Sequence, residues 1–169
     1  MRLPAIFLVG AAALLAGCAG YHLGPANGGI AREQSIEILP FNNQTLQPRL
    51  GDAVTQALRE RMQVDVTYHL ATQGAGDVVV SGVITRYHRQ GLSYLNKDAT
   101  TTENYRVDIV AHVVARERAT GKLLLEKNVP AYALVNVGTD LASSERQASP
   151  LLAEDLAQNI AELLTDGAW

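Results

Sequence analysis

Three stretches of the chain alternate apolar and polar residues over strand-like lengths, and this pattern limits the fold more than any other feature. They span residues 77–87, 105–114 and 123–137. Side chains that alternate in this way indicate strands with one buried face. Residues 119–122 form a turn sequence between the last two stretches, with Gly121 suited to a positive φ. The pattern therefore predicts an antiparallel meander of three strands.

Details of these stretches refine the prediction. In the first, Val80 and Ile84 fall on one face and Tyr87 on the other. The polar residues 90–104 are expected to form a loop between the first two strands. Pro130 has no amide hydrogen, so we expect the third strand to lie at a sheet edge or to carry a bulge there.

Two helices and two further strands are expected outside the meander. Residues 35–41 and 64–70 alternate as strands, and residues 48–62 between them have helical spacing, which predicts a parallel strand–helix–strand crossover. A second helix is expected from residue 143 to about residue 167. The predicted order is β-α-β-β-β-β-α. We therefore expect an α+β fold, a two-layer sandwich in which a mixed, mostly antiparallel sheet of four to five strands carries two helices on one face.

The N-terminus has the layout of a secretory signal. Arg2 precedes an apolar run over residues 3–15, which is shorter than the ~20 residues that a membrane-spanning helix needs. The sequence Leu-Ala-Gly-Cys ending at Cys18 resembles a bacterial lipobox, which implies cleavage after residue 17 and acylation of Cys18. Two or three acyl chains would anchor the protein durably. Ala19, in place of aspartate, implies delivery to the outer membrane.

Cleavage would leave one domain on a tether. Residues 18–34 are rich in glycine and contain Pro25, a composition typical of a flexible linker. Residues 35–169 are long enough for a single domain with its own core. Because Cys18 is the only cysteine, no disulfide or thiolate metal site is expected, and packing alone must hold the core.

Charge is unevenly distributed along the chain. Residues 86–127 carry a net charge of +3, whereas the rest of the mature chain carries −7. This asymmetry favours an anionic partner for the middle of the chain, with an ordinary solvated strand face as the alternative. Nucleic acid is not an expected partner, since an exported chain with a formal net charge of −3 is poorly suited to it.

No catalytic or cofactor motif is present. The chain has no nucleophile elbow, phosphate-binding loop, dinucleotide fingerprint or zinc-protease motif. Its four histidines are scattered singly, which disfavours a metal site. Residues 43–45 match a glycosylation sequon, but a lipobox indicates a bacterial export route on which that sequon carries no meaning. We expect a protein that is not an enzyme and that has no cofactor.

Several segments resemble one family when they are taken together. The chain resembles the lipopolysaccharide-assembly lipoproteins of the LptE family in four segments, in order along nearly the whole mature chain: Gly20–Leu23 (GYHL), Pro40–Thr45 (PFNNQT), Leu50–Leu58 (LGDAVTQAL) and Asp77–Gly82 (DVVVSG). No one of these motifs is specific alone. The extra Ala19 after the cysteine and the loop at residues 91–104 depart from the family pattern.

The resemblance implies a non-enzymatic role at the periplasmic side of the outer membrane. The domain would act as a plug in the barrel protein LptD, help that barrel to assemble, and contact lipopolysaccharide. A polar hairpin suits the polar lumen of a large barrel. The candidate contacts to phosphate or to lumen carboxylates are basic side chains, since guanidinium groups match such oxygens: Arg86, Arg89, Lys97 and Arg106.

Other functions stay open at this point. The segment LPFNNQT, a helix and then DVVVSG also resemble the start of lipoprotein activators of penicillin-binding proteins and of curli-secretion-like factors. A lipid-anchored periplasmic enzyme is a third hypothesis, which the lack of a catalytic constellation disfavours. The sequence does not identify the partner, the oligomeric state or the order of strands in the sheet.

Overall fold

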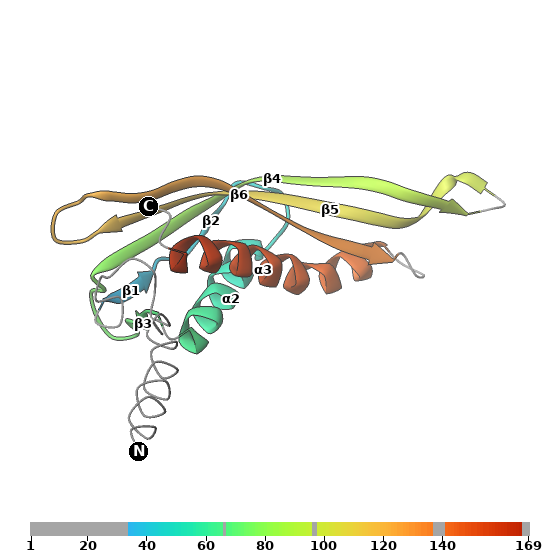
Figure 1. The fold of residues 1–169 in the computed structure, drawn as a ribbon. Helices are drawn as coiled ribbons and strands as arrows, with labels where there is room; N and C mark the ends of the chain where they lie inside the picture. The colour runs from blue at the N-terminus through green and yellow to red at the C-terminus, as the bar shows by residue number, and fades with distance from the viewer. Residues whose placement is uncertain (1–33, 66, 96–97, 137–140, 167–169) are drawn as a thin grey trace, which may run out of the picture.

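The computed structural model describes residues 34–65, 67–95, 98–136 and 141–166. The elements along the chain are β1 (Ser35–Ile38), β2 (Asn42–Asn43), α2 (Leu50–Val64), β3 (His69–Leu70), β4 (Val78–Leu95), β5 (Asp98–Glu117), β6 (Leu123–Asn136) and α3 (Leu141–Thr165). All strands belong to one sheet of order β3-β1-β4-β5-β6, with β2 beside β4. Both helices lie on the same face of this sheet (Figure 1). The predicted α+β fold is confirmed, but the sheet has six strands instead of the expected four to five, because Asn42 and Asn43 form a separate short strand.

The sheet is mixed because its two halves run differently. β1 pairs in parallel with both β3 and β4, so it lies between strands that follow it in sequence. β4, β5 and β6 form the predicted antiparallel meander. Gly121, in the turn between β5 and β6, has a φ of 70°, as expected. The parallel pairing of β1 with β3 agrees with the predicted crossover.

The core lies between the sheet and the helices. Along β5 every second residue from Val107 to Ala115 is fully buried. The predicted stripe of α2, including Leu50, Leu58 and Met62, is also fully buried. In α3 the buried stripe contains Ala148, Leu152, Leu156, Ile160 and Leu164. The buried side chains, which recur at every second residue on the strands and at every third or fourth residue on the helices, thus form one core.

Tyr87 does not lie on the predicted face. The register between β4 and β5 shifts after Ile84, so that Arg86 pairs with Val110 and Tyr87 with buried Ile109. Thr85 is the extra residue of this β-bulge, and it moves the residues that follow it, up to the next register shift after Gly91, to the opposite face. Tyr87 therefore packs partly buried against the core.

The predicted strand over residues 64–70 is mostly wrong. Helix α2 continues to Val64, whose side chain is exposed, and of the described residues in this range only His69 and Leu70 pair with β1. Asp65 ends the helix and its Oδ1 accepts the amide of Thr67 at 2.7 Å. Short alternation over a few residues cannot distinguish such a side-chain turn from a strand.

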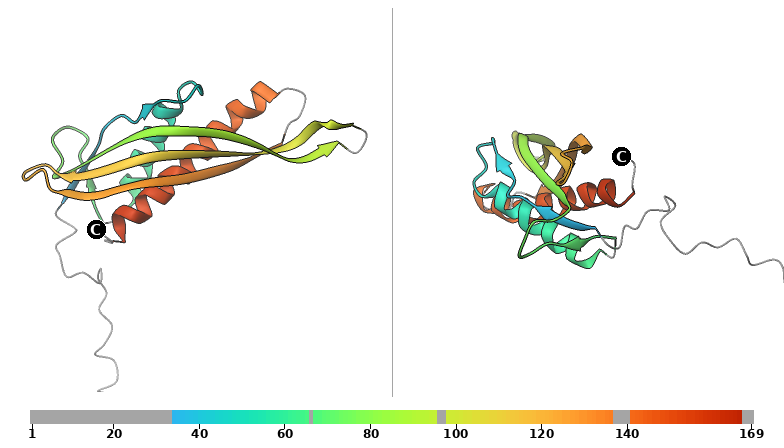
Figure 2. Two further views of the ribbon diagram at one scale, coloured as in Figure 1. Left: turned by 90° about the horizontal axis from the view of Figure 1, so that it is seen from above. Right: turned by 90° about the vertical axis from the view of Figure 1, so that its left-hand side faces the viewer.

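The expected loop at residues 90–104 is also wrong, because most of it is strand. β4 runs to Leu95 and β5 begins at Asp98, and the two strands stay paired with several irregularities. This end of the hairpin projects beyond both helices (Figure 2). Away from the helices neither face of the hairpin has a core to cover, so the sequence there lacks the apolar alternation of a half-buried strand.

Side chains occupy open backbone groups on the edge strand β6 and on β1 where it continues past its short partner β3. On β6, Pro130 has no amide hydrogen and its carbonyl accepts Asn159 Nδ2 at 2.9 Å, while the amide of Tyr132 donates to Asp155 Oδ2 at 2.9 Å. On β1, Arg59 Nη2 donates to the carbonyl of Ile38 at 2.8 Å. Occupied backbone groups and proline discourage pairing with a foreign strand. The prediction that Pro130 lies on an edge strand is confirmed.

Candidate functional site

The face of β4, β5 and β6 that points away from the helices is covered by neither of them (Figures 1 and 2). We call it the outer face. Its side chains alternate with the buried ones and are half-buried or exposed. They include Arg86, His88, Gln90, Arg106, Asp108, Val110, His112, Val114, Arg116, Glu126, Asn128, Tyr132 and Leu134. The surface is thus polar and of mixed charge, with a few apolar side chains between the polar ones.

Arg106 is held in place by neighbours on the outer face. Its Nε donates to Asp108 Oδ1 at 2.8 Å, and its guanidinium carbon lies 4.1 Å from the centroid of the Tyr132 ring on β6. Solvent-exposed pairs of this kind contribute only about 0–1 kcal/mol to stability. Their effect is therefore to orient the guanidinium and not to hold the fold.

A second polar contact crosses from β5 to β6. Nδ1 of His112 lies 3.1 Å from Asn128 Oδ1, and its Nε2 lies 3.4 Å from Glu126 Oε1. The register places His112 directly opposite Asn128. The outer face thus carries hydrogen-bond donors and acceptors, and both basic and acidic side chains, along its length. Such a surface suits a polar partner.

Arg86 and Arg89 line a groove at the bulge of β4, which we call the basic groove. It has a volume of about 760 Å³ and is bounded by residues 85–89 and by the loop of residues 44–47. No acidic residue is among those that line it. The register puts Arg86 on the outer face, whereas Arg89 is opposite buried Val107 and so belongs to the other face of the strand.

The loop that forms one wall of the basic groove is fixed by Asn43. Its Oδ1 accepts the amide of Thr45 at 3.0 Å and the hydroxyl at 2.7 Å, and its Nδ2 donates to the carbonyl of Gln47 at 2.6 Å. These bonds make a side-chain turn. The asparagine and threonine of the apparent sequon are thus used to shape this loop.

The four predicted cationic contacts are not gathered into one cluster. Arg86 and Arg89 share the basic groove, whereas Arg106 lies further along the hairpin, opposite Gln90 of β4 and Leu134 of β6. Lys97 and the predicted lipidation site Cys18 lie outside the described residues. The sequence did not point to Tyr132 as the partner of Arg106, because that contact depends on the register of two strands.

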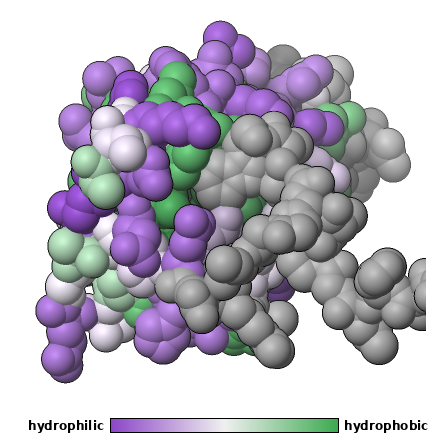
Figure 3. Space-filling view, turned by 60° about the vertical axis from the view of Figure 1, so that its left-hand side comes forward, coloured by the Kyte–Doolittle hydropathy of each residue, from purple (hydrophilic) through white to green (hydrophobic). Residues whose placement is uncertain are grey.

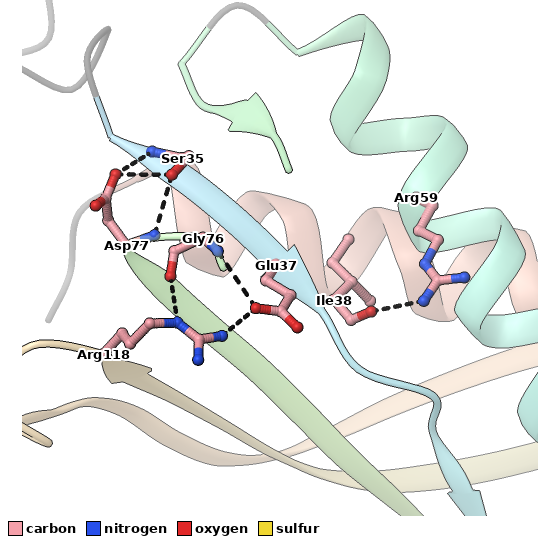
Figure 4. Close-up of polar contacts among 7 residues, drawn as sticks. All are labelled: Ser35, Glu37, Ile38, Arg59, Gly76, Asp77 and Arg118. Atoms are coloured by element: carbon pink, nitrogen blue, oxygen red, sulfur yellow. Dashed lines mark hydrogen bonds and ion pairs between the residues drawn. The ribbon is translucent and has the colours of Figure 1, made fainter. Parts of the chain in front are cut away.

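A polar junction fixes the end of the domain at which the N-terminal segment enters (Figure 4). The amide and hydroxyl of Ser35 both donate to Asp77 Oδ2, at 2.8 and 2.7 Å, and the amide of Asp77 donates to Ser35 Oγ at 3.0 Å. The backbone and side-chain hydrogen bonds from Ser35 lower the pKa of Asp77.

Arg118 completes this junction from the end of β5. Its Nε donates to the carbonyl of Gly76 at 2.8 Å, and its Nη2 pairs with Glu37 on β1. Seen from this end, the molecule has a largely hydrophilic surface in which hydrophobic side chains show as smaller patches (Figure 3). The junction and the tip of the hairpin lie at opposite ends of the molecule (Figure 1).

Two further observations on the described residues concern metal binding and the membrane. They contain no group of three or more His, Cys, Asp or Glu side chains that could hold a metal ion. None of the helices in the described ranges is long and apolar enough to cross a membrane.

Solved structures share this fold at low sequence identity. A hypothetical protein from Chlamydia trachomatis aligns over 78% of this chain and 95% of its own, with a TM-score of 0.56 and 11% identity. A candidate lipoprotein from Caulobacter crescentus aligns over 75% and 88%, with a TM-score of 0.54 and 8% identity. A protein from Xanthomonas campestris aligns over 78% and 85%, with a TM-score of 0.51 and 11% identity. A search of curated protein sequences gives no significant match.

The fold is that of a two-layer α+β domain with a polar sheet face that neither helix covers and with a projecting hairpin. The sequence model of one family, LptE, described as lipopolysaccharide-assembly, matches residues 33–166. The chain belongs to the LptE family of lipopolysaccharide-assembly lipoproteins, whose role is non-enzymatic. This confirms the resemblance drawn from the sequence segments.

Proposed function

We propose that this protein is an outer-membrane lipoprotein that plugs the lipopolysaccharide-translocating barrel LptD, assists its assembly and contacts lipopolysaccharide. The observation that carries the proposal is the family match over nearly the whole domain. The protein performs no catalysis in this role. Its contribution is a shaped polar surface held at the membrane.

The anchor and the hairpin suit this role. Lipidation would hold Cys18 at the periplasmic side of the outer membrane. Ser35, where the first strand begins, is 17 residues further along the chain. A fully extended segment of that length spans at most about 60 Å. Because the hairpin tip lies at the end of the molecule opposite Ser35, the anchored domain can present the hairpin at a distance from the acyl chains.

The outer face suits the inside of a barrel. The lumen of a large outer-membrane barrel is polar, so a plug needs hydrogen-bonding side chains on the surface that meets the wall. Arg106, Asp108 and His112 supply these on the outer face, and Tyr132 adds an aromatic contact. Aromatic residues and arginine are enriched in protein interfaces.

Lipopolysaccharide contact is assigned to the basic side chains. Arg86 and Arg89 line a groove without acidic residues, so a phosphate group there would meet basic side chains from both faces of β4 and no carboxylate. Lys97 and Arg106 are further positively charged residues in the sequence of the hairpin. Guanidinium groups bind phosphate oxygens through paired N–H donors.

Affinity purification of the native lipidated chain from outer membranes tests the proposal. We expect a stable complex with LptD, identified by mass spectrometry, and a mature N-terminus at an acylated Cys18. Recovery with a penicillin-binding protein or a secretion channel, without LptD, would support the alternative lipoprotein roles and contradict the plug. The absence of acyl mass on Cys18 would contradict the anchor.

A further inference from the structure

The two helices form a groove on the side of the domain away from the outer face. This helix groove has a volume of about 500 Å³ and lies between the first part of α2 and the first half of α3. Its apolar lining is made of small side chains and one proline: Ala53, Ala57, Pro150 and Ala153. An apolar groove bordered by charged side chains is typical of a protein interface.

Four exposed charged residues line the helix groove, and their order is the same on both helices. Arg49 precedes Glu60 along α2, and Arg146 precedes Glu154 along α3. The separations are about 16 Å on α2 and about 12 Å on α3 at 1.5 Å per helical residue. In Figure 1 α2 crosses α3 obliquely and both helices run toward the left of the view, so the arginines lie toward one end of the groove and the glutamates toward the other.

These charges are not neutralised within the described part of the chain. Arg146 donates to Ser143 Oγ and Glu60 accepts from Gln56, but none of the four forms an ion pair with another described residue. Arg49 has a φ of 61°, a left-handed conformation that glycine adopts at less cost. No contact of its side chain inside the described domain explains an arginine at this position.

A groove with one positive and one negative end is complementary to itself after a rotation of 180°. We infer that the helix groove is the interface of a two-fold symmetric dimer of this chain. Arg49 and Arg146 of one copy face Glu60 and Glu154 of the other, and the apolar linings of the two grooves face each other across the interface. The inference goes beyond the proposed function, because it concerns the protein in the absence of the barrel.

Sedimentation velocity of the purified full chain in detergent, over a range of concentrations, tests this dimer. We expect a concentration-dependent dimer whose dissociation constant rises at least about tenfold with Arg146→Glu or with Glu154→Arg, because each change sets like charges against one another. The double variant Arg146→Glu with Glu154→Arg restores the opposite-charge pairs. Its dissociation constant should return to within about threefold of the wild-type value.

Matched controls are Arg61→Glu on α2 and Glu162→Arg on α3, which reverse exposed charges outside the groove and should leave the dimer unchanged. A chain that is monomeric at all concentrations would overturn the inference. So would a dimer that the single reversals do not weaken, or one that the double variant does not restore. Copurification with the barrel is measured separately, so failure of the dimer and failure of the proposed function are distinguishable.

Discussion

The ring of Phe41 lies directly against Gly82 of β4, so that a Cβ atom at position 82 would stand 2.1 Å from Cε1 of the ring. Phe41 is 5% exposed and belongs to the core. The contact joins two of the segments that identified the family, PFNNQT and DVVVSG. The glycine is required there because an aromatic side chain occupies the space of its missing side chain.

Replacing Gly82 with alanine should therefore destabilise the protein. The ring of Phe41 must move out of a closely packed core to admit one methyl group, at an expected cost of about 1–3 kcal/mol in the free energy of unfolding. Urea denaturation followed by circular dichroism measures it. Gly74→Ala is the matched control, since a Cβ there meets no atom within 4 Å. Equal stability of the two variants would contradict this account of the contact.

Thr55 fixes the segment that carries Phe41. Its hydroxyl accepts the amide of Phe41 at 2.8 Å and donates to the carbonyl of Gly51 at 2.7 Å, and the residue is 5% exposed. Thr55→Val keeps the shape but leaves a buried amide without an acceptor, so we expect a loss of about 1–3 kcal/mol. Thr55→Ser keeps the hydroxyl and should retain more stability by the same urea assay. A valine variant as stable as the serine variant would show that this hydrogen bond does not matter.

The stability of the junction at Ser35 should depend on pH. Hydrogen bonds from Ser35 hold the pKa of Asp77 below its ordinary value, so the folded state favours the ionised carboxylate. The resulting stabilisation is present above the unfolded pKa of about 3.9 and is lost as the pH falls through the lower folded value. Asp77→Asn should therefore weaken the dependence of the urea midpoint on pH below about 4.

Ser35→Ala provides the partner variant for this measurement. It removes the hydroxyl bond but keeps the amide bond, so its pH dependence should fall between those of the wild type and Asp77→Asn. If the urea midpoints of the wild type and of Asp77→Asn changed equally with pH below about 4, the folded pKa of this carboxyl group would not be lowered. The comparison is made at constant ionic strength, because exposed charges are screened by salt.

Much of the fold could be predicted because buried residues are apolar and recur at regular spacing in the sequence. The buried alternation of β5 and the helical stripe of α2 follow directly from which side chains meet the core. Tyr87 was placed on the wrong face because one bulge residue, Thr85, reverses the alternation without any sign in composition. Val64 was placed in a strand because Asp65 ends the helix through a side-chain turn.

The candidate site was less predictable than the fold. Arg86, Arg89 and Arg106 could be singled out by charge alone, but their neighbours depend on strand register and on a distant loop. The pairing of Arg106 with Tyr132 joins two strands, and the basic groove joins β4 to residues 44–47. The helix groove was not foreseen, since its lining of alanine and mixed charge is that of any ordinary helix surface in sequence.

Charge reversal in the basic groove tests whether lipopolysaccharide binds there or is attracted only by the charge of the whole protein. Arg86→Glu with Arg89→Glu places two carboxylates where a phosphate would bind, so binding of lipopolysaccharide should weaken by roughly tenfold or more through repulsion and the loss of charged hydrogen bonds. Arg61→Glu with Lys122→Glu changes the net charge by the same amount at exposed sites outside the groove and should have little effect. Arg59 is unsuitable as a control because it donates to the carbonyl of Ile38. Equilibrium binding of labelled lipopolysaccharide at two salt concentrations separates the cases: equal loss in both double variants would mean that overall charge, and not the groove, attracts the ligand.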